Sequence, residues 1–80
     1  MNTDINIADI LFHLHPDTTP DCKGRIEEGL RAQEGVISVH FNEEDHPHAV
    51  VVAYNPEASS SQALLAEIRK CDKEAVMAGF

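Results

Sequence analysis

Alternating hydrophobic and polar residues predict β-strands at four places along the chain. The predicted strands are 8–15, 36–44, 48–56 and 74–80. In the first of them, Ile10, Phe12 and Leu14 occupy every second position, so His13 and His15 fall on the opposite face. This period of two is typical of a strand that buries one face and exposes the other to water. The four segments therefore predict a sheet with one covered face.

The segment 18–35 carries the signals of an α-helix. Thr19 is a good N-cap, Pro20 fits the first helical turn, and Asp21 puts a negative charge near the positive end of the helix. Gly35 is placed to end the helix. We expect the Thr19 hydroxyl to cap the helix by accepting a hydrogen bond from the backbone amide three residues later.

A second helix is predicted over 59–72, capped by one of its three leading serines. Leu64, Ile68 and Cys71 follow one another at offsets of four and seven residues, which is the spacing of an apolar stripe. On this pattern Cys71 packs into the core. The alternative is that Cys71 approaches the start of the first helix, where Cys22 lies.

The elements follow the order strand, helix, strand, strand, helix, strand. With right-handed crossovers, this order gives an α+β fold of the ferredoxin-like βαββαβ type. It has a four-stranded antiparallel sheet, both helices on one face, and the first strand between the third and the fourth. We expect one domain, 1–80, with 1–7 as a flexible or edge N-terminus. This topology brings several loops to one end of the sheet. These loops carry five Cys and His residues: Cys22, His15, His46, His48 and Cys71.

Composition and charge limit the classes of partner. Six Lys and Arg against fourteen Asp and Glu give a formal net charge of −8, which opposes binding to nucleic acid or to an anionic membrane. The N-terminal residues lack a signal-peptide pattern, and no apolar run is long enough to span a membrane. We therefore expect a cytoplasmic protein whose two cysteines are thiols.

No pattern in the sequence predicts an enzyme. No serine lies beside a general base, and no glycine-rich loop could hold a phosphate. Eighty residues with four glycines also leave little room for a substrate cleft. The Cys and His residues are therefore more informative than any catalytic set.

The chain resembles the heavy-metal-associated domains of copper chaperones, mercury-binding scavengers and metal-pumping ATPases. The resemblance runs from about Ile10 onward and rests on four segments: CKGRIEEGL (22–30), EGVISVHFN (34–42), VAYNPE (52–57) and LLAEI (64–68). It implies the ferredoxin-like fold, a bound copper or zinc ion, and a metal-transporting ATPase or another protein as partner.

The family's metal-binding loop reads Gly-Met-x-Cys-x-x-Cys, and this chain departs from it. Cys22 falls on the second cysteine, while Thr19 stands at the first and Pro16 and Asp17 replace Gly and Met. A hydroxyl is a poor ligand for a soft cation. Lys73 falls where the family carries an aromatic residue or a lysine, and a lysine there offsets the charge of the thiolates.

Each candidate ligand also has a structural interpretation. Cys22 is either a ligand at the helix start or a small apolar residue packed under it. Surface exposure on the open sheet face accounts for most of the histidines. His15 is the exception, because it could approach His48 or His46 across the strands.

Two functional hypotheses follow. The first is a metal-handling protein that binds one copper or zinc ion at a non-standard Cys and His site, alone or shared between two molecules. Its candidate ligands are Cys22, His15, His48, His46 and Cys71, with Thr19 and Lys73 in support. The second is a metal-free interaction or dimerisation module that uses the open sheet face around Ala49, Val51 and Ala53.

Overall fold

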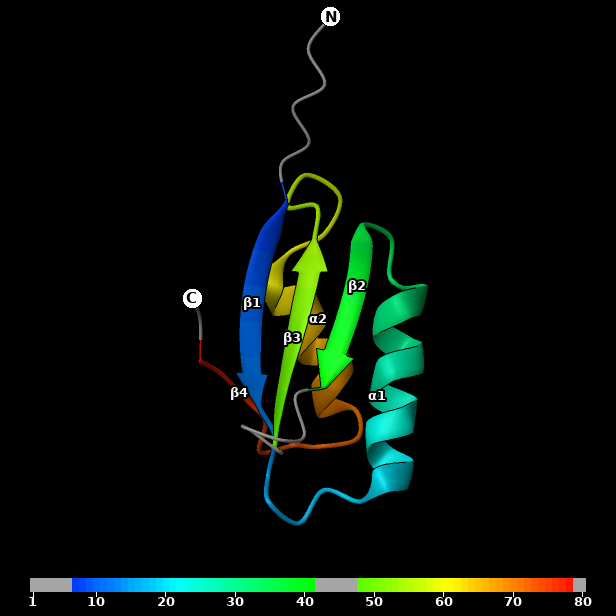
Figure 1. Ribbon diagram of the computed structural model, residues 1–80, viewed down its shortest axis with the longest axis vertical. Coiled ribbons are helices and arrows are strands. Elements are labelled where there is room, and N and C mark those ends of the chain that lie inside the picture. The colour runs from blue at the N-terminus through cyan, green and yellow to red at the C-terminus, as the bar shows by residue number, and fades with distance from the viewer. Residues whose placement is uncertain (1–6, 42–47, 79–80) are drawn as a thin grey trace, which may run out of the picture.

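The predicted order of elements is present in the computed structural model, which describes residues 7–41 and 48–78. The elements are β1 (Ala8–His13), α1 (Pro20–Ala32), β2 (Val36–Phe41), β3 (Ala49–Tyr54), α2 (Ser61–Arg69) and β4 (Val76–Met77). Both helices lie against the same face of the sheet (Figure 1). No helix among the described residues is both long and apolar enough to cross a membrane.

The four strands form one antiparallel sheet in the order β2-β3-β1-β4. β1 therefore lies between β3 and β4, as predicted. His13, at the end of β1, is paired with Ala49 at the start of β3 and with Val76 at the start of β4. This register brings the exit of β1 and the entries of β3 and β4 to the same end of the sheet (Figure 1).

The core lies between the sheet and the two helices. Ile10, Phe12 and Leu14 are buried, which confirms the period-two pattern of the first strand. Ile26 and Leu30 from α1 meet Leu64 and Ile68 from α2 and complete this core together with inward-facing residues of the sheet. The apolar positions of both helices and of β1, β2 and β3 thus form one continuous cluster.

The start of α1 confirms the predicted cap. The Thr19 hydroxyl oxygen accepts a hydrogen bond from the Cys22 amide at 3.1 Å, and Pro20 begins the helix. The helix ends at Ala32, before Gly35. Gly35 instead makes the turn into β2 with a φ of 92°, a left-handed conformation that a residue with a Cβ rarely adopts.

Each predicted element is longer in the sequence pattern than in the described structure, and three of the differences lie near the loops that carry the candidate residues. β1 ends at His13, and β4 spans only Val76–Met77. α2 ends at Arg69, so Cys71 lies beyond the helix and is exposed. The prediction that Cys71 continues the apolar stripe into the core is therefore wrong, because the helical periodicity stops before this residue. The segment 42–47, between β2 and β3, lies outside the described residues.

Core and surface isoleucines provide a matched test of this packing. Ile68 is fully buried, whereas Ile37 is 52% exposed. We expect Ile68→Ala to lower the free energy of unfolding by about 2–5 kcal/mol, because it leaves a cavity under α2. The same substitution at Ile37 should cost less than about 1 kcal/mol. Denaturant titration measures both, and equal losses would contradict the assignment of the core.

Candidate functional site

The predicted convergence of loops occurs at the end of the sheet where β1 exits. The β1–α1 loop and the turn between α2 and β4 face each other there and enclose an open hollow of about 470 Å³. Its lining includes His15, Thr19, Cys22, Cys71 and Lys73. Five of the seven residues singled out from the sequence therefore border the same space.

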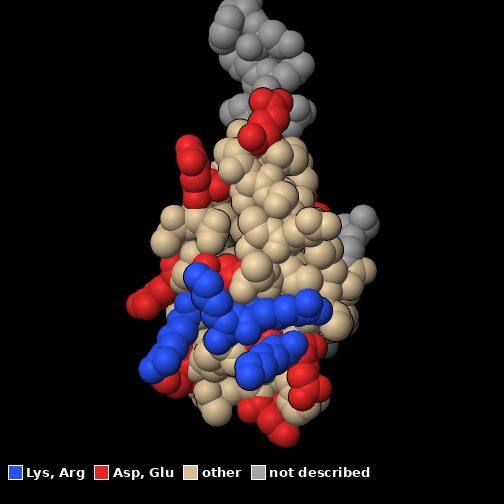
Figure 2. All heavy atoms as spheres, turned by 180° about the vertical axis from the view of Figure 1, so that it is seen from behind, with Lys and Arg blue, Asp and Glu red and all other residues tan. Residues whose placement is uncertain are grey.

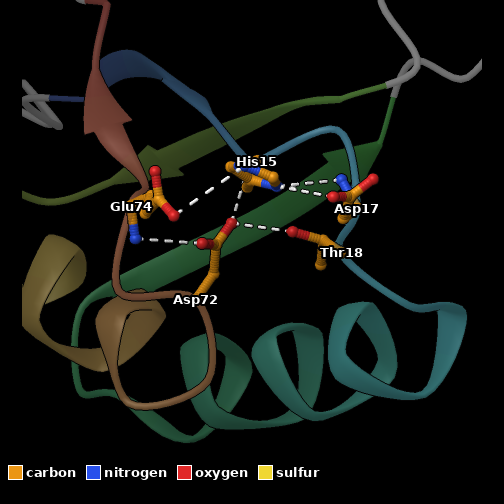
Figure 3. Close-up of polar contacts among 5 residues, drawn as sticks. All are labelled: His15, Asp17, Thr18, Asp72 and Glu74. Atoms are coloured by element: carbon orange, nitrogen blue, oxygen red, sulfur yellow. Dashed lines mark hydrogen bonds and ion pairs between the residues drawn. The ribbon is translucent and has the colours of Figure 1, made fainter.

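A buried carboxylate holds the two loops together. Asp72 is 6% exposed, and its Oδ2 accepts hydrogen bonds from the His15 amide at 2.7 Å and from the Thr18 hydroxyl at 2.8 Å. Its Oδ1 accepts from the Glu74 amide at 3.0 Å, within its own turn (Figure 3). The carboxylate is thus bonded to the loop before α1 and to the turn after α2 at the same time.

These contacts also set the charge of Asp72. Burial alone would raise the pKa of its carboxyl, but the hydrogen bonds from the His15 amide, the Thr18 hydroxyl and the Glu74 amide lower it. The net result is a pKa below the ordinary value of 3.8. Asp72 therefore stays ionised near neutral pH, and both of its oxygens are engaged within the protein.

The imidazole of His15 is also engaged. Its Nδ1 accepts a hydrogen bond from the Asp17 amide at 3.0 Å, and its Nε2 lies 3.8 Å from Oε2 of Glu74 (Figure 3). A neutral imidazole has one lone pair, and here the Asp17 amide takes it. In this arrangement the ring orders the loop and has no free lone pair for a metal.

The two cysteines meet across the hollow. Cys22, in the first turn of α1, and Cys71, in the turn after α2, form a disulfide with their Cα atoms 5.9 Å apart. Cys22 is half-buried and packs against the core, whereas Cys71 is exposed. The structure thus has the alternative arrangement for Cys71, in which it approaches Cys22. The expectation that the two cysteines are thiols is wrong for this structure, because the fold brings them within bonding distance.

The other candidate residues lie less close together. The backbone carbonyl of His48 accepts from the Leu14 amide at 2.6 Å, and its Nδ1 is buried without a hydrogen-bond partner among the described residues. His46 lies outside the described residues. Within 7–41 and 48–78, no three His, Cys, Asp or Glu side chains gather into a metal centre. In that part of the chain, Cys22 and Cys71 are the two candidate ligands that the structure bonds to each other.

The sequence analysis did not predict the role of Asp72. Its carboxylate accepts hydrogen bonds from His15 and Thr18, which precede it by 57 and 54 positions, and contacts so distant in sequence leave no periodic pattern. The one local hint is the turn in which Asp72 accepts from the Glu74 amide two residues on, a bond that Asp side chains often make.

Lys and Arg side chains gather on one face of the molecule, where several of them pair with acidic side chains. Figure 2 shows Lys and Arg side chains close together on the face opposite to that of Figure 1, with acidic side chains around them. Arg25 pairs with Asp21, Arg31 with Glu27 and Lys70 with Glu67. Exposed pairs of this kind contribute little to stability.

Reducing the disulfide should weaken the fold. The bond closes a loop with a sequence separation of 49 residues, and removing such a cross-link increases the entropy of the unfolded chain. We expect the reduced protein to lose about 2–4 kcal/mol in the free energy of unfolding. Denaturant titration with and without a phosphine reductant measures this loss. The double variant Cys22→Ser, Cys71→Ser should not respond to the reductant, and an unchanged wild type would contradict the prediction.

Asp72 should make the stability depend on acidic pH. Because its pKa is lowered in the folded state, the ionised carboxylate stabilises the fold fully above the unfolded-state value near 3.8. This contribution disappears as the pH falls through the lower, folded-state pKa. We expect Asp72→Asn to cost about 1–3 kcal/mol at neutral pH, and the gap to wild type to shrink in acid.

Thermal unfolding at neutral and acidic pH measures that gap. Asp9→Asn, at an exposed position of β1, is the matched control and should leave the stability nearly unchanged. A gap for Asp72→Asn that stays constant from neutral to strongly acidic pH would contradict the role given to the carboxylate.

Solved structures share this architecture. The N-terminal domain of a potential copper-translocating P-type ATPase from Bacillus subtilis, in its Cu(I)-loaded state, superposes with a TM-score of 0.78 at 27% identity and covers 92% of this chain and 90% of its own. The yeast copper transporter domain Ccc2a superposes with a TM-score of 0.70 at 21% identity, and the match covers 88% of this chain and 93% of that domain. Oxidized MerP from Ralstonia metallidurans superposes with a TM-score of 0.73 at 16% identity, and the match covers 92% of this chain and 97% of MerP.

No family model and no curated protein matches the chain in sequence. The similarity to known proteins is therefore one of structure, and it extends over nearly the whole chain. The chain has the ferredoxin-like fold of the heavy-metal-associated type that these copper-binding domains share.

Proposed function

We propose that this chain is a small metal-handling protein that binds one copper(I) ion between Cys22 and Cys71 in their reduced state, for metal transfer or homeostasis. The observation that carries the proposal is the pairing of these two sulfurs, whose Cα atoms are 5.9 Å apart, at one end of a heavy-metal-associated fold.

The type and number of ligands favour copper(I) over zinc. Thiolates are soft ligands that select copper(I), whereas a structural zinc site requires four ligands. Within the described residues no three His, Cys, Asp or Glu side chains form a group that could hold a metal, whereas the two cysteines are bonded to each other. The lone pair of the His15 Nδ1 is engaged by the Asp17 amide. A two-thiolate site therefore fits this end of the molecule better than a mixed Cys and His site.

The charges around the hollow are mixed. Two thiolates and one copper(I) ion carry a net negative charge, which a nearby cation stabilises. Lys73 lines the same hollow as the two cysteines, but Asp17, Asp72 and Glu74 line it too and oppose that charge. The choice of copper(I) therefore rests on the sulfur ligands and not on the charge of the lining.

The exposed sulfur suggests how the ion would move to a partner. Cys71 lies on the surface, so an incoming thiolate of another protein could reach an ion bound beside it. One of the similar structures is a domain of a potential copper-translocating ATPase. We therefore propose a metal-transporting ATPase as the partner, with exchange of thiolate ligands as the step.

A second candidate function is a metal-free interaction or dimerisation module. Its support is the row of half-buried Leu11, Val51 and Ala53 on the sheet face away from the helices. Ala49, expected on the same surface, is 1% exposed and cannot contribute to a contact there. The predicted row thus lacks one of its three residues, and the metal-handling function is the better supported of the two.

Copper(I) titration under anaerobic conditions tests the proposal. Protein reduced with a phosphine is titrated against a chromophoric copper(I) chelator. We expect one ion per chain, with affinity lost in Cys22→Ser and in Cys71→Ser. Each loss should exceed the roughly 10–100-fold change that substitutions around a metal site cause.

Histidine variants provide the controls. His40→Ala changes an exposed residue of β2 and should leave the copper(I) affinity unchanged. His15→Ala should weaken binding only through loss of loop order, so its effect should stay below that of either cysteine variant. Copper(I) binding that survives the loss of both cysteines, or an absence of saturable binding, would refute the proposed function.

A further inference from the structure

We propose that Cys22 and Cys71 form a reversible thiol–disulfide exchange site with a fixed polarity. A small monothiol of the glutathione class attacks Cys71, and Cys22 leaves as the thiolate. The reaction uses the sulfurs of the proposed copper(I) site but does not require metal. Where the proposed function holds, the exchange decides whether the site is open to the ion.

Accessibility distinguishes the two sulfurs. Cys71 lies in the turn after α2 and is exposed, whereas Cys22 is half-buried and packs against the hydrophobic core. Thiol–disulfide exchange requires the attacking thiolate to approach the sulfur along the S–S bond, so access decides which sulfur is attacked. An external thiol therefore meets Cys71 first.

The two helix ends favour the same polarity. Cys22 lies in the first turn of the 13-residue helix α1, where the positive end of the helix dipole stabilises a thiolate. Cys71 follows the C-terminus of α2, and its amide donates to the Ile68 carbonyl at 3.2 Å. The negative end of that helix disfavours a thiolate. Because the better-stabilised thiolate leaves faster, Cys22 is the leaving group.

Charged neighbours modify this difference without reversing it. Asp21 opposes a thiolate in the same helical turn, but its carboxylate lies 3.6 Å from the Arg25 guanidinium. Lys73 lines the hollow beside both sulfurs and attracts an anionic thiolate. The carboxylates of Asp17, Asp72 and Glu74 line the same hollow and disfavour a thiolate on either cysteine. The dipoles of α1 and α2 thus remain the main source of asymmetry.

The exchange balances without any further reactant. In the first step the monothiolate forms a bond to the Cys71 sulfur, the Cys22–Cys71 bond breaks, and Cys22 keeps the electron pair as a thiolate. A second monothiolate attacks the sulfur of the bound monothiol, releases its disulfide, and leaves Cys71 reduced. Two electrons pass from two thiols to the protein disulfide. In the reverse direction the monothiol's disulfide is the oxidant.

The Asp72 hydrogen bonds favour re-formation of the disulfide. They join the loop before α1 to the turn after α2 without using either sulfur, so Cys22 remains beside Cys71 after the disulfide opens. The Cys22 thiolate can then attack the mixed disulfide at Cys71 and expel the monothiol. Only the fully reduced pair has the two thiolates that a soft ion needs.

Mapping the mixed disulfide in metal-free protein tests the inference. Oxidised wild type is mixed with reduced glutathione, quenched at early times with acid and a maleimide, and digested with trypsin. Cleavage at Lys23 and Lys70 separates the two cysteines. We expect glutathione on Cys71 and maleimide on Cys22, about tenfold more often than the reverse.

Single-cysteine variants test the polarity independently. At mildly acidic pH, where the thiolate fraction sets the rate, iodoacetamide should alkylate Cys22 in Cys71→Ser faster than Cys71 in Cys22→Ser. Thermal unfolding checks that both variants fold.

Three outcomes would overturn the inference: glutathione on Cys22 as often as on Cys71, reduction only in denaturant, or faster alkylation of Cys71. Because no metal is present in either experiment, exchange at Cys71 together with failed copper(I) titration would refute only the proposed function. Copper(I) binding without the predicted exchange would refute only this inference.

Discussion

The site depends on one buried carboxylate. Asp72 accepts hydrogen bonds from the His15 amide and the Thr18 hydroxyl while its own turn closes on the Glu74 amide. A buried charge is stable only when such donors compensate the loss of water. The carboxylate therefore holds together two loops that are far apart in sequence, and we call its hydrogen bonds to His15, Thr18 and Glu74 the Asp72 joint. The positions of Cys22 and Cys71 follow from it, because each cysteine lies within a few residues of the joint.

This joint gives the chain a way to place two sulfurs that differs from a local motif. In the heavy-metal-associated loop that the sequence resembles, both cysteines lie in one turn, and a local backbone conformation sets their spacing. Here Thr19 occupies the first position and caps α1. The second sulfur comes from Cys71, at a sequence separation of 49 residues. The two sulfurs are therefore brought together by folding, and they differ in exposure and in the helix end beside them.

The sequence predicted what depends on local periodicity and capping. The alternation of Ile10, Phe12 and Leu14 gave a correct buried face, and the strand order and the Thr19 cap were also predictable. The end of α2 was not, because Lys70 and Cys71 continue a helical pattern that the turn toward β4 interrupts. Nor was Asp72, whose partners His15 and Thr18 are adjacent only in the fold. The sequence was therefore sufficient to predict that the candidate residues lie at one end of the sheet, but not which of their side chains contact one another.

The central claim is that the Asp72 joint, and not the S–S bond, keeps Cys22 beside Cys71. Nuclear Overhauser effects between the β-protons of the two cysteines in the fully reduced, metal-free protein test it most directly. The account predicts that these effects persist after reduction and that the His15 amide stays protected from exchange. Their loss in a protein that otherwise keeps its fold would show that the disulfide alone brings the sulfurs together, and would contradict the account.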